Sequence, residues 1–177
     1  MIKTFKENDE VLYPNEEFVS LSKQDFLILK KLADQNKRKR IRLCAHKNSS
    51  DELHEMFIVH SKECYVRPHF HVDKSESLYV IEGSADLIIF NNNGSIKKKV
   101  VLSDNLKDGL LFHRQEPGTI HMIIIKTEHF IFHEVTQGPF KRADTIFPLW
   151  APAGNIITDN SFIQKLFLEA NIINEKI

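Results

Sequence analysis

Cysteine is scarce in this chain of 177 residues, which contains only Cys44 and Cys64. Two cysteines without metal-knuckle spacing cannot build a disulfide framework, so a reducing cytoplasm is the expected setting. Long hydrophobic runs are absent as well. No stretch approaches about 18 uncharged apolar residues, and the first residues, MIKTFKENDE, lack an apolar segment. The sequence therefore predicts neither a membrane span nor secretion.

An excess of charge of one sign is also missing. Lysine plus arginine and aspartate plus glutamate number 24 each, which argues against nucleic acid or a membrane surface as partner. The basic run KRKRIR (37–42) is the local exception, and we interpret it as a solvated helix end that leads into a strand. With 42% hydrophobic residues and no repeats or low-complexity linkers, the chain is expected to form one domain.

Short apolar runs and turn signals recur about every ten residues, which is typical of an antiparallel sandwich or barrel. A helix is expected at 22–36, where Ser22 can cap it, and a second at 161–170, with an Asp159-Asn160 cap and Phe162, Leu166 and Phe167 on one side. Strands are expected at 41–46, 54–60, 64–68, 77–82, 85–90, 95–102, 109–113, 121–126 and 129–135. The predicted organisation is an N-terminal extension (1–40), a β-barrel (41–140), and a C-terminal loop and helix (141–177).

Three of these strands, DLIIF, HMIIIK and HFIFH, are apolar on consecutive residues instead of alternating. Both faces of such strands need a cover, which either the terminal helices or a second subunit could supply. We therefore predict a homodimer as one way to bury them.

Two histidines stand one residue apart in PHFHVDKSESLYVIEG (68–83). In an extended segment the side chains of His69 and His71 lie on the same side, about 6.5 Å apart, and can converge on one ion. Glu76 would begin the next strand at the head of an apolar face, where an unpaired carboxylate is costly. A fourth candidate is His121, which the Pro117-Gly118 turn delivers onto a strand.

Three histidines and a glutamate suit Fe, Zn, Mn, Ni or Co as a divalent ion, and an octahedral ion would keep two positions open for water or substrate. The alternatives are that the histidines are hydrogen-bonded structural residues and that Glu76 pairs with Arg67 or Lys74. The remaining histidines, at positions 54, 60, 113, 129 and 133, have no spacing partner and are expected to be structural.

Further polar residues are candidates for the same cavity. Arg67 shares the parity of His69 and His71 and could anchor a carboxylate or phosphate. Lys74 and Arg42 are further candidates for binding the substrate. Arg42, Cys44 and His46 share one face of their strand. If that face lines the pocket, His46 becomes a candidate acid or base; if it faces water, it is a solvated edge.

The pattern His69-x-His71, four residues, Glu76, six residues, Gly83 resembles the first motif of the cupins, and Pro117-Gly118-x-x-His121 resembles the second. Glu63 and Ile125 stand where the pattern has glycine and asparagine. CAH (44–46), LHEMFIV (53–59), RPHFHVDKSES, HEVTQGPF (133–140) and WAP (150–152) are together similar to the WbuC-type cupin-fold metalloproteins of bacterial surface-polysaccharide gene clusters. The resemblance implies a small jelly-roll barrel with the metal inside, in a bacterial cytoplasm and in O-antigen or exopolysaccharide biosynthesis, without a defined activity.

Several functions are compatible with these patterns. The first is a metal-dependent isomerase, epimerase or oxygenase acting on an anionic, sugar-derived substrate. The second is a non-catalytic module that binds a sugar or sugar nucleotide. The third is a metal-independent sugar-nucleotide epimerase or ketoisomerase that uses histidine and tyrosine as base and acid, against which the complete ligand set argues.

Overall fold

The computed structural model describes residues 2–105, 107, 109–154 and 161–174, and beyond residue 160 it describes the side chains of 161–166, 168 and 169. Its helices are α1 (Lys23–Gln35) and α2 (Ser161–Asn174), with a short 3-10 turn at Arg142–Asp144. Its strands are β1 (Thr4–Asn8), β2 (Val11–Pro14), β3 (Arg40–Cys44), β4 (Leu53–Ser61), β5 (Phe70–His71), β6 (Glu76–Glu82), β7 (Ser84–Phe90), β8 (Ile96–Ser103), β9 (Phe112–Gln115), β10 (Ile120–Ile125), β11 (His129–Gln137) and β12 (Thr145–Ile146).

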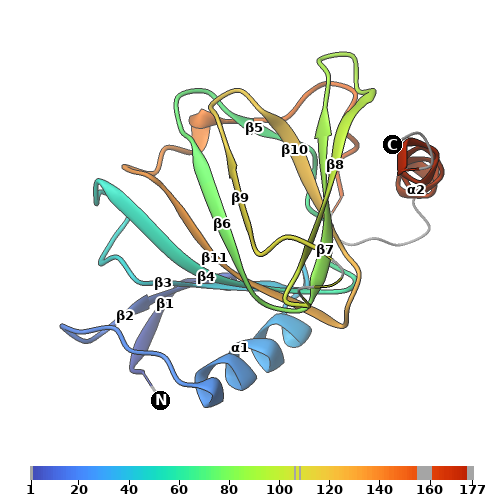
Figure 1. Cartoon of the computed structure of the whole chain (residues 1–177). Helices are drawn as coiled ribbons and strands as arrows, with labels where there is room; N and C mark the ends of the chain where they lie inside the picture. Colours follow the sequence, from blue (N-terminus) through green and yellow to red (C-terminus); the bar gives the residue numbers. More distant parts are fainter. Residues whose placement is uncertain (1, 106, 108, 155–160, 175–177) are drawn as a thin grey trace.

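The strands form a barrel from a large and a small sheet (Figure 1). The large sheet has the order β1-β2-β3-β4-β11-β6-β9, the small one the order β10-β7-β8, and β12 pairs with β5 as a separate two-stranded ribbon. Among the named strands of the described residues, β2 and β3 pair in parallel and the other pairs are antiparallel. The predicted cupin-type antiparallel β-barrel, with a helix near each end of the chain, is confirmed.

The interior face of the large sheet carries residues of even number on β3, β4, β6 and β11. Met56, Leu78 and Phe132 are buried there in one cluster with Leu87 and Ile123 from the small sheet. Because side chains alternate along a strand, the even-numbered polar residues of these strands also face the interior. The polar residues of the site described below lie on this face.

Helix α1 covers the outer face of β3 and β4 (Figure 1). Leu29 and Ala33 of the helix are buried against Ile41, Val59 and Ile131 in a second cluster. The Ser22 cap is present, since Asp25 accepts hydrogen bonds from the Ser22 backbone at 2.9 Å and from its hydroxyl at 2.6 Å. The predicted helix at 22–36 is therefore confirmed to within one residue at each end.

Helix α2 covers the outer face of the small sheet. Its residues Ile163 and Leu166 are buried with Ile88, Ile124 and Met122, and Phe162 packs against the same cluster. The Asp159-Asn160 cap and the Phe167 side chain lie outside the described residues. A helix behind each sheet thus explains the consecutive apolar residues of β7, β10 and β11. The sequence left open whether the terminal helices or a second subunit cover these strands, and the helices do so.

Other expectations about elements were wrong. The segment 64–68 is not a strand: its backbone has an isolated bridge at Cys64 and no further sheet pairing, and the side chains of Tyr65 and Arg67 bind the carbonyls of Pro152 and Ala151. Strand β9 begins three residues later and ends two residues later than the predicted strand 109–113. Strands β1 and β2 were not predicted; they lie in the expected N-terminal extension, before α1, and extend the large sheet.

Candidate metal centre

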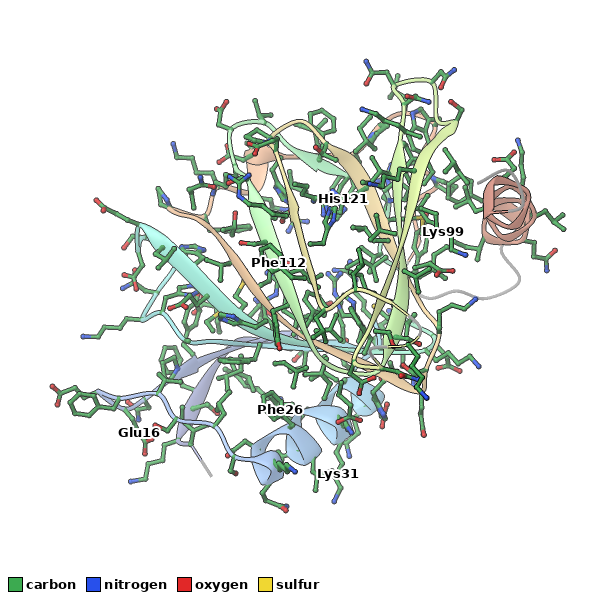
Figure 2. All side chains as sticks on the ribbon, in the orientation of Figure 1. Glu16, Phe26, Lys31, Lys99, Phe112 and His121 are labelled. Atoms are coloured by element: carbon green, nitrogen blue, oxygen red, sulfur yellow. The ribbon has the colours of Figure 1, made fainter. Side chains whose placement is uncertain are left out.

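His69 and His121 come from distant parts of the sequence and are neighbours through their backbones. The His69 N–H donates to the His121 carbonyl at 3.0 Å, and the His121 N–H donates to the His69 carbonyl at 2.9 Å. Their ring centroids lie 4.5 Å apart, and His71 lies 5.3 Å from His69. Figure 2 shows His121 inside the barrel, between the two sheets. The structure therefore brings the three predicted histidines together.

Glu76, at the start of β6, faces these histidines from the large sheet. Its Oε1 lies 3.1 Å from His71 Nε2, and its Oε2 lies 3.3 Å from His121 Nε2. Among the described residues, no ion pair joins Glu76 to Arg67 or Lys74, the alternative that the sequence left open. The fourth predicted ligand thus lies where the three histidines converge.

The three rings are oriented by hydrogen bonds at Nδ1. His69 Nδ1 donates to the Arg67 carbonyl at 2.8 Å, and His121 Nδ1 donates to the Thr119 carbonyl at 3.0 Å. The Thr145 hydroxyl on β12 lies 3.3 Å from His71 Nδ1. Histidines that bind metals are commonly held through their second nitrogen in this manner, which leaves Nε2 as the ligand atom.

Gln115 is a site residue that sequence analysis missed. It faces the interior from β9, opposite Glu76, and its amide donates to Glu76 Oε2 at 2.7 Å. The same nitrogen lies 2.9 Å from His121 Nδ1. The signal was available in the sequence, because Gln115 precedes the Pro117-Gly118 turn that positions His121.

Glu76 itself occupies the centre of the cluster as hydrogen-bond acceptor. Among the described residues, no group of three or more histidine, cysteine, aspartate or glutamate side chains is arranged so that it could hold a metal ion as it stands. An ion would have to come between the Glu76 oxygens and the Nε2 atoms of His71 and His121, which now lie 3.1 and 3.3 Å apart. The donor types fit a divalent transition metal, whereas the present spacing is that of a hydrogen-bonded cluster.

Burial and mutual contact set the protonation of the cluster. Desolvation, followed by the neighbouring His121, lowers the pKa of His69, and desolvation also lowers that of His121. Burial alone would raise the pKa of Glu76, but the hydrogen bond from His71 and the nearby histidines lower it. Burial alone would lower the pKa of His71, but the hydrogen bond and charge of Glu76 raise it. Carboxylate and neutral imidazoles are the forms in which these groups bind metals, so a bound ion would displace a proton from His71.

The interior face also carries two charged residues outside the cluster. Arg42 faces the interior from β3, as the first of the two readings of that strand predicted, and its guanidinium contacts Met56 Sδ at 3.7 Å. Glu134 faces the interior from β11. Desolvation, followed by the charge of Glu76, raises the pKa of Glu134 to about 7. Sequence analysis included Glu134 only as part of HEVTQGPF.

The remaining predicted residues lie around this interior. Arg67 donates twice to the Ala151 carbonyl, at 2.9 and 3.1 Å, and its guanidinium lies 4.7 Å from the Phe147 ring. Lys74 donates to the Pro139 carbonyl and lies 3.6 Å from Asp144. Their predicted contact with substrate stays a prediction.

His46 lies just beyond the end of β3 and is buried. Its ring stacks on His54 at 4.0 Å, and its Nδ1 hydrogen-bonds to the backbone of Glu55. Desolvation lowers the pKa of both histidines. The structure thus gives His46 a packing role, and its predicted role as acid or base stays a prediction.

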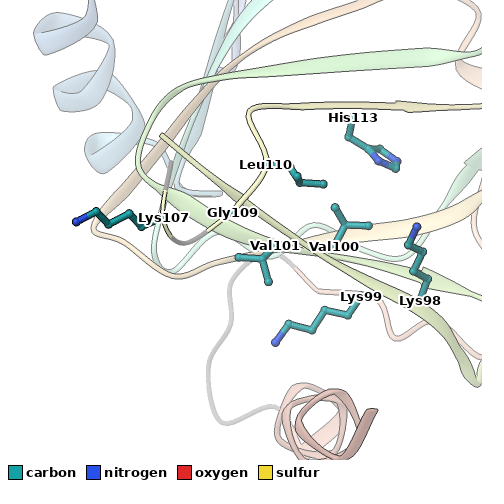
Figure 3. A pocket seen from close by; sticks show the side chains of 8 residues that line it. All are labelled: Lys98, Lys99, Val100, Val101, Lys107, Gly109, Leu110 and His113. Carbon is teal, nitrogen blue, oxygen red and sulfur yellow. The ribbon is translucent and has the colours of Figure 1, made fainter. Parts of the chain in front are cut away.

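A basic groove opens in the barrel wall where β8 and β9 diverge (Figure 3). It has a volume of about 370 Å³ and is lined by Lys98, Lys99, Val100, Val101, Lys107, Gly109, Leu110 and His113. Lys99 lies 3.2 Å from Asp86 and is neutralised by it. His113 lies two residues from Gln115 on β9, and both side chains face the interior. The groove therefore borders the cluster from the side.

Comparison with known families gives one match. A model described as a domain of unknown function, DUF6016, matches residues 21–102, somewhat less than half of the chain. No curated protein matches the chain.

Several solved structures are similar to this chain. Protein SO0799 from Shewanella oneidensis is 12% identical, with 72% of this chain and 85% of that chain covered and a TM-score of 0.53. The capsular polysaccharide assembling protein CapF from Staphylococcus aureus is 18% identical, with 55% and 27% covered and a TM-score of 0.48. Oxalate decarboxylase from Bacillus subtilis is 19% identical, with 61% and 27% covered and a TM-score of 0.48. The chain thus spans about a quarter of the last two proteins, and these likenesses concern the fold.

Proposed function

We propose that this chain is a metal-binding cupin protein, with one divalent transition metal held by His69, His71, Glu76 and His121. The observation that carries the proposal is the approach of the His71 and His121 Nε2 atoms to the Glu76 carboxylate, with the His69 ring packed against both histidines and each Nδ1 occupied by a hydrogen bond. A purely structural histidine cluster would not need two rings aimed at one carboxylate and a third packed beside them. A bound ion would act there as a Lewis acid that polarises a carbonyl or hydroxyl of the ligand.

The ligand that we propose is an anionic, sugar-derived small molecule. Arg42 faces the interior and is the best placed of the predicted anion-binding residues, while Arg67 and Lys74 lie nearby. The setting in bacterial surface-polysaccharide biosynthesis rests on the sequence resemblance described above. We propose a cytoplasmic location because both cysteines are buried free thiols, as expected in a reducing compartment. Among the described residues, neither helix has the length and apolar composition that a membrane crossing requires.

The experiment that tests the proposal combines metal analysis with a panel of nucleotide sugars and sugar acids. We expect His121→Ala to lose the metal, and with it any ligand-induced rise in melting temperature. Conversion of a panel compound, detected by mass spectrometry, would identify an enzyme. A raised melting temperature without product would identify a binding module. Full metal occupancy in His121→Ala would remove this residue from the ligand set.

We also propose that the chain forms a homodimer through the outer face of β6 and β9. Tyr79 and Phe112 are directly opposite each other in the sheet register and are 49% and 55% exposed. The interior residues are even-numbered on β6 and odd-numbered on β9, so Tyr79 and Phe112 both lie on the outer face. This area lies beside the one that α1 covers. An exposed aromatic pair on a sheet is a common element of subunit interfaces.

A further inference from the structure

Glu134 places a carboxylate between apolar side chains of the interior face, at the border of the histidine cluster. The sheet register sets it opposite Met56 on β4 and opposite Leu78 on β6, and both neighbours are buried in the interior cluster. Phe132, the preceding residue of the same face, is buried as well. A carboxylate in such surroundings lowers stability unless it has a partner, so its presence calls for an explanation.

The fold supplies no such partner. Among the described residues, no hydrogen bond or ion pair reaches the Glu134 carboxylate. Arg42 is the nearest source of positive charge on the same face, but it lies beyond ion-pair distance, and its side chain donates to Met56 Sδ, a weak acceptor. A guanidinium and a carboxylate thus face the same interior without being paired to each other.

Glu134 lies next to the histidine cluster, and Arg42 lies on the same interior face, two strands further from Glu76, on β3. Thr136 is opposite Glu76, and Glu134 is opposite Leu78, so Glu134 and Glu76 are diagonal neighbours on one face, at about 7 Å. Arg42 and Glu134 each keep part of their surface exposed. A small molecule that reaches this face would meet Glu134 between Arg42 and the cluster, because β11 lies between β3 and β6 in the sheet.

We propose that the interior site takes a hydroxylated carboxylate, such as a sugar acid, whose carboxylate binds Arg42 and whose hydroxyl binds Glu134. This inference rests on the proposed function, which places the ligand beside the cluster. A guanidinium binds a carboxylate through two parallel hydrogen bonds, and a glutamate binds a hydroxyl as acceptor or, when protonated, as donor. One arginine beside an acidic residue suits a monoanion better than a phosphate dianion, because Glu134 would repel the second charge.

The probe is D-glucuronate, titrated into the full-length, metal-loaded chain by calorimetry. The test variants are Arg42→Gln and Glu134→Gln. Their matched controls are Arg114→Gln, an exposed arginine on β9, and Glu55→Gln, whose side chain lies on the outer face of β4. We expect each test variant to lose at least tenfold in affinity, each control to stay within twofold of the unmodified chain, and D-glucose, which lacks the carboxylate, to bind at least tenfold more weakly.

Metal content and melting temperature are measured on the same samples. Metal bound at one ion per chain without glucuronate binding would overturn this inference and leave the proposed function standing, whereas absence of metal would overturn the proposed function itself. Equal affinities of Glu134→Gln and Glu55→Gln would also overturn the inference. So would a lower melting temperature of Glu134→Gln than of Glu55→Gln, because it would show that the Glu134 carboxylate stabilises the fold.

Discussion

His69 and His121 exchange two backbone hydrogen bonds, each N–H donating to the carbonyl of the other residue. This isolated bridge ties the segment before β5 to β10 at the position where both imidazoles enter the barrel. The spacing of the first two histidines is a property of the local chain, but their meeting with His121 depends on this long-range pairing. The site is therefore a product of the barrel topology as much as of the motif.

Gln115 is expected to strengthen metal binding by orienting Glu76. Replacing it by leucine removes the donor to Glu76 Oε2 and leaves the carboxylate freer to turn. Loss of such an outer contact weakens metal sites by about 10- to 100-fold. A competition titration with a chromophoric chelator measures the affinity of Gln115→Leu. The control is Gln24→Leu, an exposed position on α1, and equal affinities of the two variants would contradict the prediction.

The stability of the fold is expected to fall in acid partly because of His60. Desolvation, followed by the charges of Arg40 and Arg42, lowers the pKa of His60 well below its usual value. The unfolded chain binds a proton at this residue near pH 6.5 and the folded chain does not. The free energy of unfolding is therefore unaffected by His60 above that pH and decreases as the pH falls below it. Between about pH 7 and pH 5 the decrease amounts to about 2 kcal/mol.

Urea denaturation at both pH values checks this contribution. The variant His60→Gln should lose about 2 kcal/mol less on acidification than the unmodified chain, because glutamine does not titrate. The other histidines are common to both proteins and cancel in the comparison. If the free energy of unfolding of His60→Gln falls by as much between the two pH values as that of the unmodified chain, His60 is protonated in the folded chain.

Asp25 is expected to be important for the docking of α1. Its carboxylate is buried and accepts hydrogen bonds from the backbones of Ser22 and Ile2 and from the Ser22 hydroxyl. Asp25→Ala leaves these donors without an acceptor and should lower the free energy of unfolding by about 2 kcal/mol. Chemical denaturation measures the change, with the exposed Asp9→Ala as control. A loss no larger than that of Asp9→Ala would contradict the role of this cap.

The proposed dimer interface predicts a dependence on one exposed aromatic residue. Phe112→Glu would place a charge on each copy at the centre of the shared surface and should convert the dimer to a monomer. Light scattering after gel filtration measures the mass of both proteins. The exposed Leu53→Glu, at the far end of β4, is the control. A monomeric unmodified chain would contradict the proposed homodimer.

The parts predicted from the sequence are those that depend on local patterns. The Ser22 cap with Asp25 in the first turn marked α1, and the turn at Pro117-Gly118 marked the entry of His121. The parts that could not be predicted depend on long-range packing. Tyr65 and Arg67 have a strand-like sequence, yet their side chains bind the segment at 151–152. The position of Glu134 inside the barrel follows from the register of β11 between β4 and β6, which no local pattern encodes.

Elemental analysis by mass spectrometry tests the metal site most directly. The chain is purified without chelator, together with His69→Ala/His71→Ala and with His129→Ala/His133→Ala, a control that removes two histidines with outward parity on β11. We expect close to one transition-metal ion per chain in the unmodified protein and in the control, and none in the first double variant. Equal metal content in all three proteins, or no metal in any of them even after reconstitution, would contradict the proposed metal centre.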